Sequence, residues 1–131
     1  MNDAERILAA AQTVLVIDWP SRDVPESLAR SGRMVVVQGG PGPEDHTAWE
    51  LQDGEVVVRP VGRRPEHADL VYSYRPLDEL PAIVATAVEL GAHAIWTQLP
   101  PDQSRQARET VEAASLAYIG EPYIAEAVRR L

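Results

Sequence analysis

Short runs of consecutive apolar residues alternate with segments of helical pattern along most of the chain. Such runs occupy residues 13–17, 34–37 and 117–119, and largely apolar runs that include Asp69 or end in Gln98 occupy residues 68–72 and 94–98. A strand that is apolar throughout is buried on both faces, which is typical of a parallel sheet covered by helices. Parallel neighbours need crossover connections, and these are right-handed and usually helical. The alternation therefore predicts an α/β fold.

Helical patterns fill the intervals between the apolar runs. In residues 77–90 the apolar face consists of Leu80, Ile83, Val84, Ala87 and Val88, and Gly91 ends the segment. Further helices are expected at residues 3–12, 25–31, 102–114 and 122–131, the last with Ile124, Val128 and Leu131 on its apolar face.

The segment between residues 38 and 68 has no helical pattern. It opens with the glycines and prolines of residues 39–43, which predict a long irregular stretch. The turn signal Asp53-Gly54 precedes a short edge strand at residues 55–59, and residues 61–67 read as a polar loop. We therefore expect one domain over residues 1–131. Its fold class would be α/β, a three-layer, doubly wound, Rossmann-like domain with a mainly parallel sheet of about five to six strands.

Composition excludes several classes of function. The 131 residues include no cysteine, which removes disulfides, thiolate metal sites and cysteine nucleophiles. All twelve basic residues are arginine, so lysine Schiff-base chemistry is excluded too. The net charge of -8 disfavours nucleic acid as a partner. No apolar run approaches the length of a membrane span and the start resembles no secretory signal, so we expect a cytoplasmic protein without membrane association.

The usual catalytic patterns are missing from the sequence. No serine lies in a G-x-S-x-G elbow, and the chain contains neither a P-loop nor a G-x-G-x-x-G motif. The histidines at positions 46, 67 and 93 lack metal-ligand spacing, and His93 is expected at the surface. We therefore expect no metal site and a role that is not catalytic, unless another chain completes an active site.

Residues 68–100 carry a more specific pattern. A strand ends in Tyr74-Arg75-Pro76, and an acidic helix start follows at Asp78-Glu79. Glu89-Leu90-Gly91-Ala92 comes next, and then a strand with Trp96 and Gln98. This order resembles the coenzyme A-binding domain, which occurs as small stand-alone bacterial proteins. It is also similar to the amino-terminal domain of the succinyl-CoA synthetase α subunit.

The resemblance implies that coenzyme A or an acyl-CoA binds at the carboxyl ends of the strands. Arg75 offers a fixed fork of donors to a phosphate, and Gln98 can meet an adenine edge. Arg22 suits a phosphate contact, although pairing with Asp18 or Asp23 is the alternative. The cofactor-binding residues we predict are Asp18, Trp19, Ser21, Arg22, Gln38, Gly39, Arg75, Pro76 and Gln98.

Structural roles compete with these binding roles. Arg75 can pair with Asp78 or Glu79 as an internal bridge. Gln98 can anchor a loop by hydrogen bonds, and Trp96, in mid-strand, is expected in the core rather than against a ligand.

A second function remains open. Ile17 and Trp19 stand where the family has a turn of small residues that lets backbone approach a pyrophosphate. A degenerate fold of this kind would act as a protein-interaction or scaffold module without nucleotide. Exposed Trp19, Trp49 and Tyr123 would then mark its surface. A homodimer is compatible with either function.

Overall fold

A computed structural model of the whole chain describes residues 2–17, 21–40 and 45–131. It contains a seven-stranded sheet in the order β4-β3-β2-β1-β5-β6-β7. The strands are β1 (Thr13–Ile17), β2 (Met34–Gln38), β3 (His46–Gln52), β4 (Glu55–Pro60), β5 (Leu70–Ser73), β6 (Ala94–Thr97) and β7 (Ala117–Ile119). The helices are α1 (Asp3–Ala10), α2 (Asp23–Arg30), α3 (Leu80–Glu89), α4 (Ser104–Glu112) and α5 (Ile124–Arg129), with short 3-10 turns at Leu77–Glu79 and Pro101–Gln103.

The sheet is parallel except at one end. β1 pairs in parallel with both β2 and β5, and the parallel order continues through β6 and β7. β3 and β4 form an antiparallel hairpin that extends the sheet beyond β2. This arrangement confirms the α/β class and the mainly parallel sheet.

The expected strand count was too low. We expected about five to six strands, and the sheet has seven because β3 forms inside the stretch expected to be irregular. Asp53 and Gly54 both have positive φ, 53° and 83°, which is the geometry of a two-residue hairpin turn. The edge strand expected at residues 55–59 is present as β4.

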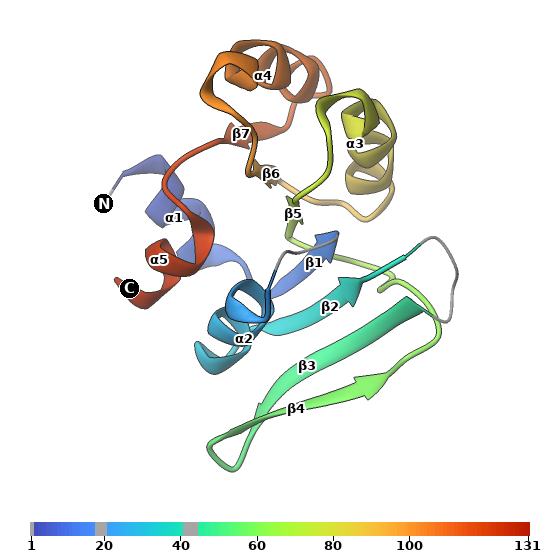
Figure 1. Cartoon of the computed structure of the whole chain (residues 1–131), viewed down its shortest axis with the longest axis vertical. Helices are drawn as coiled ribbons and strands as arrows, with labels where there is room; N and C mark the ends of the chain where they lie inside the picture. Colours follow the sequence, from blue (N-terminus) through green and yellow to red (C-terminus); the bar gives the residue numbers. More distant parts are fainter. Residues whose placement is uncertain (1, 18–20, 41–44) are drawn as a thin grey trace.

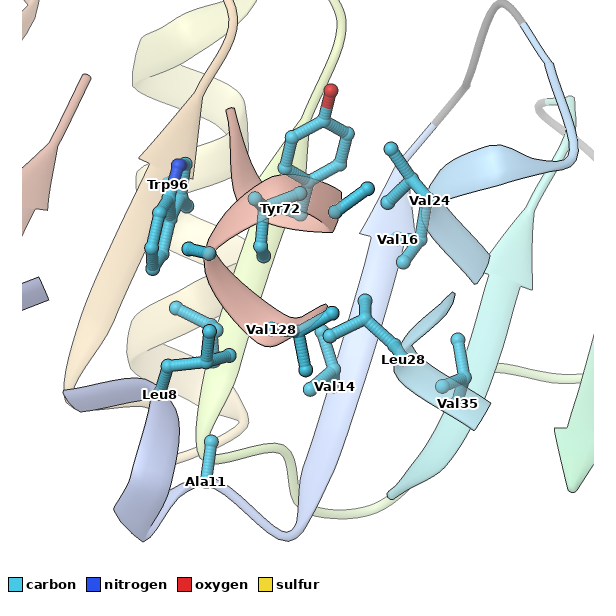
Figure 2. Packing of buried hydrophobic residues seen from close by; sticks show 14 of the residues in the cluster. Leu8, Ala11, Val14, Val16, Val24, Leu28, Val35, Tyr72, Trp96 and Val128 are labelled. Atoms are coloured by element: carbon cyan, nitrogen blue, oxygen red, sulfur yellow. The ribbon is translucent and has the colours of Figure 1, made fainter. Parts of the chain in front are cut away.

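Helices cover both faces of the sheet (Figure 1). Successive residues of a strand point to opposite faces, so Val14 and Val16 join one core while Leu15 and Ile17 join the other. The first core lies beneath α1, α2 and α5, and Figure 2 shows its side chains converging. The second core lies beneath α3 and α4.

Trp96 is fully buried in the first core, as expected, and its ring N–H donates to the carbonyl of Pro122 (2.9 Å). Two apolar residues expected inside are exposed instead. Val88 is 54% exposed because it lies about 100° round the helix from Ala87, which faces the sheet. Leu131 is exposed because α5 ends at Arg129.

Among the described residues, no helix combines the length and the hydropathy that crossing a bilayer requires.

Candidate functional site

The carboxyl ends of β1 and β5 lie side by side at the centre of the sheet. The chain leaves β1 toward α2, which packs on one face, and leaves β5 toward α3, which packs on the other. Ligands of open α/β sheets bind at such a point, where the connections diverge. The candidate site is therefore formed by the described residues at and just beyond the carboxyl ends of β1, β2, β5 and β6.

Among the described residues, two clefts lie beside this point. The Arg75 cleft, of about 360 Å³, lies between the segments after β5 and β6 and is lined by Tyr74, Arg75, Pro76, Leu77, Gln98, Leu99, Pro100 and Gln103. The Gln38 cleft, of about 370 Å³, lies between the ends of β1 and β2 and the start of α3. It is lined by Ile17, Gln38, Asp78, Glu79, Ala82, Ile83 and Thr86.

The structure brings together only part of the predicted set. Three of its residues, Arg75, Pro76 and Gln98, line the Arg75 cleft, and Gln38 lines the other. Neither cleft is lined by the described residues Ser21, Arg22 or Gly39, although these residues come after the ends of β1 and β2. Asp18 and Trp19 lie outside the described residues.

An ion pair stands between the two clefts. The Arg75 guanidinium donates to both carboxylate oxygens of Glu79, from Nε to Oε1 (3.1 Å) and from Nη2 to Oε2 (2.6 Å). Arg75 lines one cleft and Glu79 lines the other. The internal bridge foreseen for Arg75 is therefore confirmed, with Glu79 as its partner. The Arg75 side chain is 37% exposed, so solvent still reaches the guanidinium.

Gln98 is held by a neighbouring strand. The hydroxyl of Tyr72, on β5, donates a hydrogen bond to Oε1 of Gln98. Burial of the Tyr72 ring raises the pKa of its hydroxyl, and the nearby hydroxyls of Tyr123 and Tyr74 raise it further. Tyr72 therefore remains a protonated donor at neutral pH. This contact is the loop anchor that the sequence offered as the alternative role of Gln98.

Arg22 has a partner that the sequence did not indicate. Its guanidinium lies over the ring of Trp49, 4.6 Å from the ring centre, as in a cation–π contact. The expected pair with Asp23 is replaced, because the Asp23 carboxylate accepts from the Tyr123 hydroxyl (3.0 Å) and from Arg129 (2.9 Å). Burial, and then the hydrogen bond to Asp23, raise the pKa of Tyr123 to about 12.

Several lining residues were not predicted from the sequence. Tyr74 and Leu99 belong to segments that directly follow strands, and this position was the signal that could have identified them. The Gln38 cleft is also lined by Ala82 and Thr86 of α3 and by Glu79 of the turn that precedes it. These residues reach the cleft only because of the way α3 packs on the sheet, and the sequence pattern of a helix does not reveal that packing.

We also searched the described residues for a metal site. Among them, no group of three or more histidine, aspartate or glutamate side chains is placed to hold a metal ion. His93 is exposed, as expected, and His67 contacts Asp69 at 2.8 Å, outside both clefts.

Comparison with known proteins identifies relatives of this chain. The family model described as CoA binding domain matches residues 16–125. No curated protein matches. Among solved structures, Prb, a PH1109 protein redesigned for binding, is 20% identical with a TM-score of 0.65, covering 98% of this chain and 89% of its own. A protein of unknown function from Methanothermobacter thermautotrophicus is 12% identical with a TM-score of 0.51, covering 91% and 85%. These structural likenesses show the fold, and the family match covers most of the sequence: the chain belongs to the CoA binding domain family.

Proposed function

We propose that this chain binds coenzyme A or an acyl-CoA at the Arg75 and Gln38 clefts and does not transform it. The observation that carries the proposal is the family match over residues 16–125, a range that includes every segment lining the two clefts. Their position, where connections diverge from adjacent parallel strands, is the usual place for a nucleotide in such sheets.

Arg75 is the phosphate-binding group in this proposal. A guanidinium presents a planar fork of donors that matches two phosphate oxygens, and such charge-assisted bonds are stronger than neutral ones. Glu79 occupies that fork with both of its oxygens. A phosphate therefore competes with Glu79 for Arg75.

A protein-interaction module is the second candidate. It is favoured by the internal partners of three predicted binding residues, because Arg22 stacks on Trp49, Arg75 pairs with Glu79 and Gln98 accepts from Tyr72. The exposed aromatic surface expected for it is wrong at Trp49, which is only 3% exposed, and at Tyr123, which is half-buried, while Trp19 lies outside the described residues. This module would then need another surface.

Thermal unfolding with coenzyme A, acetyl-CoA, NAD, ATP and AMP separates the two functions. A ligand at about 100 times its dissociation constant stabilises the folded chain by about 2.7 kcal/mol. That corresponds to a rise of several degrees in Tm for a domain of this size. We expect the rise with coenzyme A and acetyl-CoA. If none of the five ligands moves Tm, the binding proposal fails and the interaction module takes its place.

Arg75→Ala tests the residue assignment. We expect coenzyme A to bind about tenfold more weakly by calorimetry, because a hydrogen bond to a charged group contributes about 1.5 kcal/mol. Arg105→Ala is the matched control. Arg105 also pairs with a glutamate four residues on, Glu109 (3.5 Å), and lines neither cleft. Equal affinities for the two variants would remove Arg75 from the site.

A further inference from the structure

β4 forms one end of the sheet, and among the described residues no strand pairs with its outer side. It follows β3 through the tight Asp53-Gly54 turn and runs along the margin of the molecule (Figure 1). Its sequence is Glu55-Val56-Val57-Val58-Arg59-Pro60, and every one of these residues except half-buried Val56 is exposed. An open edge of this composition can pair with another strand.

The backbone groups that face outward follow from the hairpin's register. Val61 donates to the carbonyl of His46 (3.1 Å), one step beyond the pair Thr47–Pro60. Residues of an antiparallel pair alternate between facing the partner strand and facing away. Residues 55, 57 and 59 therefore bond to β3, and residues 56, 58 and 60 point outward. Proline fits the last of these positions because it has no N–H to leave unpaired.

The charges of β4 are self-complementary in one antiparallel register. When Val57 lies opposite Val57 of a second copy, Val56 faces Val58 of that copy and the two exchange backbone hydrogen bonds. The same register places Glu55 directly opposite Arg59 of the second copy, and Arg59 opposite its Glu55. Opposite charges in directly facing positions stabilise a strand pair.

We propose that this chain forms a symmetric homodimer through antiparallel pairing of two β4 strands, with the two-fold axis at Val57. The dimer joins the two sheets into one continuous sheet and does not depend on the coenzyme A proposal. It covers Val57 and Val58, which are exposed in the single chain.

Neighbouring registers are poorer on two counts. Pairing centred on Val58 places Val56 opposite Pro60 of the second copy, and the missing N–H removes a hydrogen bond. Pairing centred on Val56 sets Glu55 opposite Val57 of the second copy and moves Arg59 opposite Asp53, which lies in the turn beyond the end of β4, so both Glu55–Arg59 pairs are lost. Only the Val57-centred register of the three combines the backbone hydrogen bonds between Val56 and Val58 with the charge pairs between Glu55 and Arg59.

Arg59 can serve both strands of such a dimer. Its Nη2 donates to Glu50 on β3 (2.8 Å), while its side chain remains 55% exposed. A guanidinium has five N–H donors, so one arginine can contact Glu50 of its own chain and Glu55 of the second copy. The result is a row of alternating charges across the dimer axis.

Cross-linking tests the register. In the proposed dimer Val57 faces its own copy in a pair without hydrogen bonds, with Cα atoms about 4.5 Å apart, within disulfide range. The chain has no cysteine, so Val57→Cys introduces a single thiol. Val88→Cys, also at an exposed valine, is the control. Under mild air oxidation we expect Val57→Cys to form covalent dimer at least about tenfold faster, because the pair is already aligned.

Charge exchange tests the complementarity. Glu55→Arg and Arg59→Glu each place like charges opposite one another, so each should weaken the dimer by roughly tenfold or more in sedimentation equilibrium. An equimolar mixture of the two variants restores opposite charges at both positions, and we expect it to dimerise as the unaltered chain does. Circular dichroism establishes that both variants fold.

Three outcomes would each overturn the proposal. The first is an unaltered chain that sediments as a monomer at every concentration. The second is cross-linking of Val57→Cys no faster than that of Val88→Cys. The third is a mixture of the charge variants that dimerises no better than either variant alone.

Discussion

At the scale of single residues, the side chains predicted to bind a ligand contact other side chains of the same protein. The pair of Arg75 and Glu79 was foreseeable because they lie four positions apart in the sequence, a spacing that brings side chains together at a helix start. The bond between Tyr72 and Gln98 was not foreseeable, because it joins β5 to the residue that follows β6, 26 positions along the sequence. Arg22 and Trp49 likewise meet only through the fold. Local spacing thus predicted one partner in the site, and long-range packing determined the others.

The competition at Arg75 gives a prediction with a definite sign. Glu79→Gln keeps the shape of the side chain and removes its charge, so it weakens the hold on Arg75 and lowers repulsion of an anionic ligand. We expect coenzyme A to bind about threefold or more tightly, a modest change typical of solvent-exposed charge pairs. Calorimetry measures it, with Glu109→Gln as the matched control on α4. Weaker binding by Glu79→Gln would mean that the ion pair shapes the cleft instead of competing with the ligand.

At the scale of elements, the pattern of apolar runs located most strands but missed β3. The strands at residues 13–17 and 117–119 have the predicted bounds. β3 contains polar as well as apolar residues and runs from a buried start to an exposed end, and glycines and prolines precede it, so it lacks the continuous apolar run of the parallel strands. The Asp53-Gly54 turn was the available signal, because a two-residue hairpin turn requires a strand on each side.

The junction between α2 and α5 allows a test of element packing. The Tyr123 hydroxyl, just before α5, donates to Asp23 at the start of α2 (3.0 Å), and Arg129 of α5 reaches the same carboxylate. Tyr123→Phe removes one of these bonds, and we expect a loss of about 1 kcal/mol in the free energy of unfolding in urea. Tyr74→Phe, at an exposed tyrosine, should leave that free energy nearly unchanged.

The pH dependence supplies a second signature for Tyr123. Its pKa in the folded chain is raised to about 12, above its ordinary value, so its contribution is present at lower pH and is lost as pH rises from about 10 through 12. Tyr123→Phe should therefore lose less stability than the unaltered chain over that interval. Parallel curves for the two proteins would contradict this role of the hydroxyl.

At the scale of the whole molecule, Asp69, just before β5, is hydrogen-bonded to the backbone at the start of β1. One carboxylate oxygen accepts from the backbone N–H groups of Gln12 (2.8 Å) and Thr13 (2.9 Å), and the other contacts His67. Burial raises the pKa of Asp69, but the hydrogen bonds from Thr13, His67 and Gln12 outweigh it and lower the pKa overall. The carboxylate thus stabilises the native chain in its charged form.

Acid unfolding should depend on this carboxylate. Because its folded pKa is lowered, its contribution is present above the ordinary pKa of about 4 and is lost as pH falls through the folded value. We expect Asp69→Asn to cost about 1 kcal/mol at pH 7 and to reduce the decline of stability below about pH 4. Urea unfolding across this range measures both effects. Asp53→Asn, in the exposed hairpin turn, is the control and should follow the unaltered chain.

The contact between Arg22 and Trp49 gives the molecule an optical property. Trp49 lies in β3, buried beneath a guanidinium that belongs to the segment after β1. The fluorescence of an indole responds to a charge held against its ring. A ligand that moves Arg22 away from the ring is therefore expected to change the fluorescence of Trp49. Binding at the carboxyl ends of the strands can then be followed in the native protein without an added label.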